Sequence, residues 1–306
     1  MPKDHHSHRH GHSHARSRPD YGRAFAVGIT LNTIFIAVEV VYGFMAHSLA
    51  LIADAGHNLG DVLGLFLAWG ATVLGRRAAT ERYSYGLQRS TVLAALANAV
   101  FLLIAVGAIV WEAIQRLNAP SPVVAQTIIW VAVAGIIVNT GTALMFMSGQ
   151  KDDLNIRGAF MHMAVDAVFS AGVVAGGIII MFTGWEWVDP ALSLTLSASI
   201  VYGAWTLFRD ALNLALDAVP KGIDVGAVHT YLKELPPVID AHHLHIWGLS
   251  TTEAALTVHL VLVDCQQSNE LLHEINHELH ERFGIGHATI QFESANENVC
   301  FFENCH

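Results

Sequence analysis

Two pairs of metal-binding side chains share one spacing in this sequence. His57 is followed four residues later by Asp61, and His162 is followed four residues later by Asp166. On a helix, residues four apart lie on the same face, with about 5–6 Å between their Cβ atoms. Two such pairs facing each other would offer two imidazoles and two carboxylates, a tetrahedral set that suits zinc.

Both pairs lie inside long apolar segments, where a charged side chain is costly. A carboxylate at the centre of a membrane helix costs about 2.5–3.5 kcal/mol on insertion scales, so these side chains need a partner. That partner is either another polar helix, which would make the pairs a clamp between helices, or a cation. Because the pair occurs twice, in separate segments, we expect a metal site. Asp54, one turn before His57, could be a fifth ligand, but we expect it instead to accept protons or to cap a neighbouring helix.

Six apolar segments are each long enough to cross a hydrocarbon core, which takes roughly 20 residues. We place them near residues 24–45, 49–74, 88–115, 123–147, 157–182 and 189–208. Lys and Arg number five in the N-terminal tail, four in the second connection and two in the fourth, against one in the odd-numbered connections together. This asymmetry predicts that the tail and the even connections are cytoplasmic. With six spans, both termini are then cytoplasmic.

The composition indicates a membrane domain followed by a soluble one. Hydrophobic residues make up 53% of the 306 residues and charged residues only 14%, against about 25% in ordinary globular domains. From Pro220 onward, 12 acidic residues stand against three basic ones, which favours cations and argues against nucleic acid as a partner. The pattern there predicts a helix over 224–235, strands over 238–247 and 253–264, a helix over 269–283 and a strand over 287–293.

The expected fold is therefore a membrane all-α six-helix bundle plus a small cytoplasmic α+β domain of the ferredoxin-like, metallochaperone-like kind. The second strand carries apolar residues on both faces, which predicts a central position in the sheet. So small a domain is near the lower limit for independent stability, and dimerisation should help it. We expect a His-rich cytoplasmic tail over 1–22, the transmembrane domain over 23–219, the cytoplasmic domain over 220–295 and a Cys-containing tail over 296–306.

A second set of candidate ligands lies in the soluble part. His242 and His259 fall on neighbouring predicted strands and could meet across them. Three cysteines are too few for a disulfide framework, so metal binding is the better interpretation of the two near the C-terminus. The residues that could bind a second zinc are His242, His259, His287, Glu293, Cys300 and Cys305. The alternative is that they are ordinary surface residues, because spacing cannot show that distant strands converge.

Two other histidine motifs have competing interpretations. Six histidines within residues 5–14 indicate a metal-collecting tract, or else an expression tag or filler. The run from His273 to His277 matches the His-Glu-x-x-His pattern of zinc proteases. A catalytic zinc also needs a third protein ligand, a dry cleft and an open position, for which this small domain has little room. We therefore expect no enzyme activity.

Taken together, these motifs resemble those of the cation diffusion facilitators, in particular their zinc-transporter branch. The resemblance covers nearly everything from Gly22 to Glu293. It rests on the stretch Ser48–Asp61, on Arg82-Tyr-Ser-Tyr-Gly86, on Trp111-Glu-Ala-Ile, on Asn155–Asp166 and on His242-His-Leu-His-Ile-Trp247. It implies homodimers in the lipid bilayer, in a bacterial inner membrane, that export divalent metal ions in exchange for protons by alternating access.

The resemblance also implies roles for particular residues. It places the transport ligands on His57, Asp61, His162 and Asp166, and the cytoplasmic zinc ligands on His242, His259, His287 and Glu293. Some relatives end with a Cys-x-x-Cys pair, whereas here four residues separate Cys300 from Cys305.

We therefore expect a secondary transporter that exports zinc, with cadmium or cobalt as further cargo, since imidazole and carboxylate accept several divalent ions. Zinc is expected both as the transported ion and as a regulatory ligand. Two alternatives stay open. One is a membrane-bound zinc hydrolase that uses His273, Glu274 and His277, and the other is a membrane-bound metal sensor that binds ions without moving them.

Overall fold

The computed structural model describes residues 22–147, 154–263 and 268–294. Within these ranges, six helices are long and apolar enough to cross a membrane. They are α1 (Gly22–Met45), α2 (Leu49–Gly75), α3 (Ser90–Asn118), α4 (Ala125–Phe146), α5 (Leu154–Thr183) and α6 (Val188–Ala215). All six match the apolar segments expected from the sequence. The largest difference is that α6 continues past residue 208 to Ala215, because Arg209 and Asp210 end the apolar run without breaking the helix.

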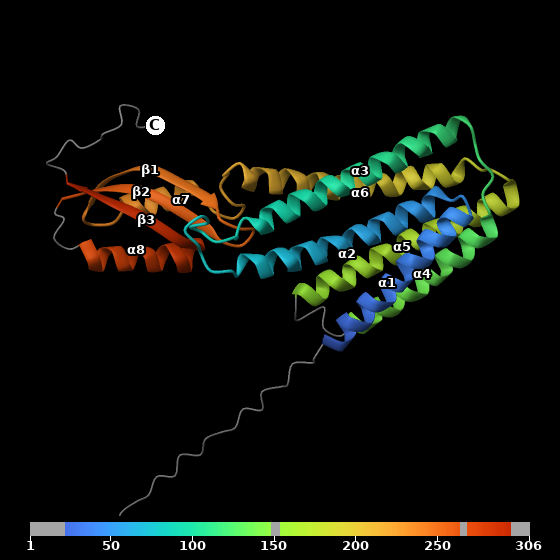
Figure 1. The fold of residues 1–306 in the computed structure, drawn as a ribbon, viewed down its shortest axis with the longest axis horizontal. Coiled ribbons are helices and arrows are strands. Elements are labelled where there is room, and N and C mark those ends of the chain that lie inside the picture. Colours follow the sequence, from blue (N-terminus) through green and yellow to red (C-terminus); the bar gives the residue numbers. More distant parts are fainter. Residues whose placement is uncertain (1–21, 148–153, 264–267, 295–306) are drawn as a thin grey trace, which may run out of the picture.

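The membrane helices form two groups. Helices α3 and α6 run side by side and extend toward the soluble domain, while α1, α2, α4 and α5 lie together beside them (Figure 1). A buried apolar core joins the two groups. It includes Phe35 of α1, Leu51 of α2, Ile128 of α4, Val173 of α5 and Leu196 of α6.

The start of α2 is tied to the start of α6 by polar groups. Ser48 is the N-cap of α2, and its hydroxyl accepts a hydrogen bond from the Leu51 amide at 3.3 Å. The buried Asp189 of α6 accepts hydrogen bonds from the Ser48 hydroxyl at 2.5 Å and from the Leu49 amide at 2.7 Å. A carboxylate is favourable here because the first amides of a helix lack hydrogen-bond partners and because the helix dipole places partial positive charge at the N-terminus. This junction holds the start of α2 against the start of α6.

The soluble domain contains α7 (Val225–Lys233), β1 (Val238–Gly248), β2 (Ala254–Leu262), α8 (Ser268–Phe283) and β3 (Ile285–Ser294). The strands are ordered β1-β2-β3, so β2 is central, as predicted. Strands β1 and β2 are antiparallel, and β2 and β3 are parallel and joined through α8. This is the α+β architecture expected from the sequence.

The two faces of this sheet differ in character. Leu256, Val258, Leu260 and Leu262 of β2 are buried in a core formed with α7 and α8. The residues between them, including His259, are only partly buried and point to the other face. The face turned away from the helices can therefore carry polar ligands.

The soluble domain contacts the membrane bundle at the ends of α3 and α6. The Arg89 guanidinium, just before α3, pairs with the carboxylate of Asp217, which lies in the link between α6 and the soluble domain. The Thr251 amide donates a hydrogen bond to the Thr91 hydroxyl at 3.2 Å. Lys221, just after α6, pairs with Asp210 at 2.6 Å. These contacts hold the soluble domain against one end of the bundle (Figure 1).

Candidate metal centres

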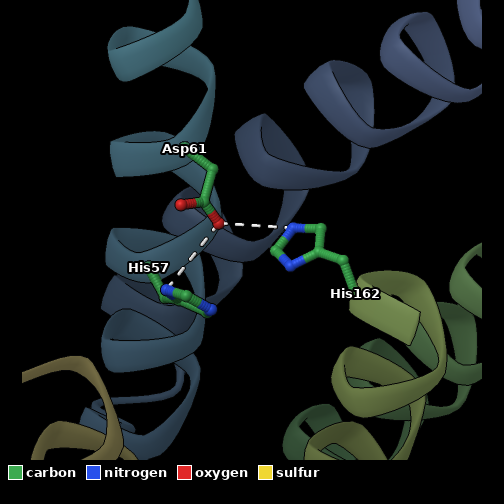
Figure 2. Close-up of side chains that lie close together, drawn as sticks. All are labelled: His57, Asp61 and His162. Carbon is green, nitrogen blue, oxygen red and sulfur yellow. Dashed lines mark ion pairs between the residues drawn. The ribbon is translucent and has the colours of Figure 1, made fainter. Parts of the chain in front are cut away.

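The first candidate centre lies between α2 and α5. Figure 2 shows His57 and Asp61 on one helix turned toward His162 on the other. Asp61 Oδ2 lies 3.8 Å from His57 Nδ1 and 3.4 Å from His162 Nε2. One ligand atom from each of the three residues lies within 4.8 Å of the other two. A single ion could reach all three with small side-chain movements.

Asp166 is the fourth residue at this centre. One carboxylate oxygen lies 3.6 Å from His162 Nε2, and the other lies 4.0 Å from His57 Nε2. The Asp166 side chain is only 1% exposed, and neither oxygen makes a hydrogen bond to the part of the chain that the structure describes. A buried carboxylate without hydrogen bonds is destabilising, and a bound cation would offset that cost. The structure brings the four residues together, and their role as ligands stays a prediction.

A cavity of about 370 Å³ lies beside this centre. Asp61 and His162 line it, together with Asn32, Asn58 and Met163. Two of the four expected ligands therefore face an internal space rather than packed side chains. Such a space allows an ion to approach the ligands from one side of the bundle.

Two more buried acids lie close to the centre. Glu39 of α1 is 0% exposed and Asp54 of α2 is 3% exposed, and the two carboxyl groups interact electrostatically. Neither oxygen of Glu39 makes a hydrogen bond to a residue in the described ranges. In the sequence, Glu39 is only a lone acid in an apolar segment. Its position next to Asp54 required the packing of α1 on α2.

The second candidate centre lies on the open face of the sheet. His242 of β1 and His259 of β2 are direct cross-strand partners. His259 Nδ1 lies 2.8 Å from Glu293 Oε1, and His242 Nε2 lies 3.3 Å from Glu293 Oε2. The ligand atoms of the three residues lie within 4.8 Å of one another, and His242 Nε2 is buried without a hydrogen bond to any described residue. Two imidazoles and a carboxylate at these distances fit a divalent cation.

His287 lies apart from this set, and this corrects the prediction that His287 is a cytoplasmic ligand together with His242, His259 and Glu293. It pairs with Ala255, whereas Glu293 pairs with Val261. At about 3.3 Å per residue, this register puts His287 roughly 20 Å from Glu293 along β3. The His287 ring instead contacts Tyr85 of the α2–α3 connection, with ring centroids 5.5 Å apart.

The remaining candidates fall into two classes. Cys300, Cys305 and the histidines of residues 5–14 lie outside the described residues. His273 and His277 lie on α8 with exposed side chains, and neither joins a metal-binding group among the residues that were placed. The geometry therefore gives the zinc-protease motif no support.

Six membrane helices with a candidate His–Asp centre, followed by a soluble domain with a second candidate centre, are the features expected of a metal-ion transporter. The chain belongs to the cation efflux family: its cation efflux transmembrane domain matches residues 25–214, and its cation efflux protein cytoplasmic domain matches residues 220–295. The resemblance to the cation diffusion facilitators and the predicted fold class are thereby confirmed.

Bacterial relatives match over nearly their whole length. The chain is 38% identical to the metal cation efflux system protein CzcD of Cupriavidus metallidurans, over 89% of this chain and 87% of that protein. It is 36% identical to the zinc transporter ZitB of Escherichia coli, over 92% and 89%. It is 32% identical to a cadmium, cobalt and zinc/H⁺-K⁺ antiporter of Bacillus subtilis, over 90% of each chain.

Proposed function

We propose that the protein exports Zn²⁺ from the cytoplasm in exchange for protons, with Cd²⁺ and Co²⁺ as further cargo. The observation that carries this proposal is the meeting of two His–Asp pairs from α2 and α5 inside the membrane bundle, where His162 Nε2 lies 3.4 Å from Asp61 Oδ2. The relatives named for zinc transport and for cadmium, cobalt and zinc antiport support the choice of ions and of proton coupling.

The chemistry of the four side chains couples the two ions. Zinc binds neutral imidazole and ionised carboxylate, so the incoming ion displaces protons, and protons arriving from the other side displace the ion. At this site the side chains of Asp61 and His162 are 38% and 40% exposed, whereas that of Asp166 is 1% exposed. Asp61 and His162 are thus more accessible to an incoming ion than Asp166 is. Alternating access requires such a site to open first on one side and then on the other.

The proposed assembly is a homodimer in the bacterial inner membrane with both termini in the cytoplasm. The excess of Lys and Arg in the N-terminal tail and even connections supports this orientation. The domain boundaries proposed are 1–22, 23–219, 220–295 and 296–306. Nucleic acid is not a proposed partner, because the cytoplasmic part is acidic.

The cytoplasmic centre is proposed to bind a regulatory zinc ion through His242, His259 and Glu293. Two acidic soluble domains repel each other, and a bound cation would reduce that repulsion. Zinc would then draw the two domains of the dimer together and raise the transport rate. Through Thr251 and Lys221, the soluble domain contacts Thr91 at the start of α3 and Asp210 near the end of α6, which gives this change a route to the bundle.

Zinc flux into sealed proteoliposomes tests the transport proposal. With the outer face of the transporter toward an acidic lumen, zinc should accumulate, and collapsing the pH gradient should slow accumulation strongly. A variant with Glu81→Ala, which removes an exposed carboxylate in the α2–α3 connection, is the matched control and should transport normally. Binding without flux would identify a sensor, and flux that ignores the gradient would identify a uniporter.

A further inference from the structure

Strand β1 carries one residue more than β2 beside the cytoplasmic centre. His242 pairs with His259 and His245 pairs with Thr257, so three steps along β1 (242 to 245) face two along β2 (259 to 257). The extra residue is His243, whose backbone φ of 51° lies in the left-handed region. Such a β-bulge position favours glycine, because a Cβ atom is strained there.

The bulge changes the face to which His243 is directed. Neighbouring residues of a regular strand point to opposite faces. His242 points to the open face, so without the bulge the side chain of His243 would point toward the apolar core. Instead, Leu244 packs against the core. The ring of His243 lies 5.4 Å from that of His242 and 5.1 Å from that of His259, measured between centroids. A strained backbone thus places a third imidazole on the open face.

The three rings form a nearly equilateral triangle. The His242 and His259 centroids are also 5.4 Å apart. With Zn–N bonds of about 2.0–2.1 Å and tetrahedral angles, the centroids of two imidazoles on one zinc ion are about 5 Å apart. The neighbouring His245 does not share this geometry: its ring is 6.3 Å from that of His243 and its side chain is exposed.

We propose that His243 is a fourth ligand of the cytoplasmic ion and completes a site with His242, His259 and Glu293. This inference rests on the proposed metal-binding role of that centre. The His243 nitrogens lie outside the group of ligand atoms within 4.8 Å of one another, so the side chain turns inward on binding. Four protein ligands leave no open position, which is typical of a zinc ion that is held rather than passed on. The site is then complete within one subunit.

Cobalt(II) binding to the full-length protein in detergent tests the inference, because tetrahedral cobalt has strong visible absorption. The parent chain carries Asp61→Ala, Asp166→Ala, Cys300→Ser and Cys305→Ser, and the histidines of residues 5–14 are replaced by serine, so that the cytoplasmic centre is the strong site remaining. His243→Gly should weaken cobalt binding at least about tenfold, the lower end of the loss seen even for outer-shell partners. Its visible absorption should also fall as water enters the coordination sphere.

Further variants separate ligation from a structural role. His243→Gly should raise the thermal stability of the metal-free soluble domain, because glycine adopts this φ without strain. His243→Cys should retain cobalt, since a thiolate is also a ligand. The matched control, His245→Ala, lies on the same strand and should match the parent in affinity and spectrum.

Two results would overturn the inference: one concerns His243 alone, and the other concerns the whole cytoplasmic centre. If the parent binds cobalt and His243→Gly binds it with the same affinity and spectrum, His243 is not a ligand and the three-residue centre stands. If the parent binds no cobalt, the proposed cytoplasmic centre fails together with the role of His243.

Discussion

The membrane and cytoplasmic centres use the same kinds of side chain on different scaffolds. In the membrane, His57 and Asp61 belong to one helix and His162 and Asp166 to another, and the shortest ion pair between the helices is 3.4 Å. In the soluble domain, the shortest pair joins His259 of β2 to Glu293 of β3 at 2.8 Å. Both sets combine imidazole with carboxylate, so the difference lies in what holds the ligands in place.

The scaffolds differ in how freely they can move. Strands β1, β2 and β3 are joined by backbone hydrogen bonds, so the ligands on them have a set register. Helices α2 and α5 satisfy their backbone hydrogen bonds internally and meet through side chains. Packed helices can shift relative to one another by small sliding motions, whereas a strand cannot move without breaking its ladder. If the proposed ligands are correct, the membrane centre is therefore the one that can separate them and release an ion at low cost.

Removing a carboxylate from the membrane centre should have the largest effect. Asp61→Ala takes away the group that bridges α2 and α5, and zinc flux should fall more than about a hundredfold, beyond the loss typical of outer-shell partners. The measurement is zinc uptake into proteoliposomes at matched protein content. Asp166→Ala should behave likewise. Normal flux in either variant, with correctly folded protein, would refute the assignment of the transport ligands.

Changing a ligand without removing it should alter which ions are carried. His57→Asp replaces an imidazole by a harder carboxylate, which should broaden acceptance toward hard ions and toward larger ions. Cadmium is larger than zinc, so the preference for zinc over cadmium should fall about tenfold. Competition between the two ions during uptake measures this ratio. The matched substitution His259→Asp in the cytoplasmic centre should leave the ratio unchanged. A shift in both variants would place selectivity outside the membrane centre.

Disrupting the cytoplasmic centre should reduce transport without abolishing it. His242→Ala together with His259→Ala removes both paired imidazoles, and export should fall severalfold because zinc no longer draws the soluble domains together. The expected signature is loss of the zinc-dependent rise in rate, with the basal rate retained. His273→Ala with His277→Ala, on the exposed side of α8, is the control. Complete loss of export would show that this centre is part of the transport path.

The sequence allowed most of the scaffold and the membrane centre to be predicted. Long apolar runs mark the six spans because the bilayer sets their length, and alternation marks the strands because one face is buried. The His–Asp spacing predicted that each pair shares a helix face. What pairs α2 with α5 is side-chain packing, so that contact rested on chemistry and resemblance until the structure placed His162 beside Asp61.

The cytoplasmic centre was harder to predict because it depends on register and backbone conformation. His287 precedes Glu293 on the same strand, and their distance from His259 follows only once β3 is known to run parallel to β2. The side-chain type of His243 is only a weak sign of a bulge, since left-handed backbone is marked most strongly by glycine. The contact of Glu39 with Asp54 likewise depends on how α1 packs.

The smallest expected effect concerns the core face of the soluble domain, away from its metal ligands. Burial, and then the nearby Glu278 and Glu274, raise the pKa of Tyr231 above its ordinary value of 10.0. A raised pKa in the folded state means that this contribution to stability is complete below pH 10 and is lost as pH rises through the folded pKa. The Tyr231 hydroxyl makes no hydrogen bond to any placed residue, and its ring packs against Phe283 with centroids 5.6 Å apart. Tyr231→Phe keeps this packing, so stability at pH 7 should change by no more than about 0.5 kcal/mol.

Above pH 10 the stability of the Tyr231→Phe variant should exceed that of its parent, the unsubstituted protein. The parent should become sensitive to a protease active at alkaline pH, whereas Tyr231→Phe should resist for longer; Tyr83→Phe, in the exposed α2–α3 connection, is the control. Cobalt affinity at neutral pH should be the same in all three, because the ligands occupy the opposite face of the sheet and their register is held by the strands. If Tyr231→Phe weakened cobalt binding, the two faces would be coupled, and the cytoplasmic centre would be as adaptable as the membrane centre.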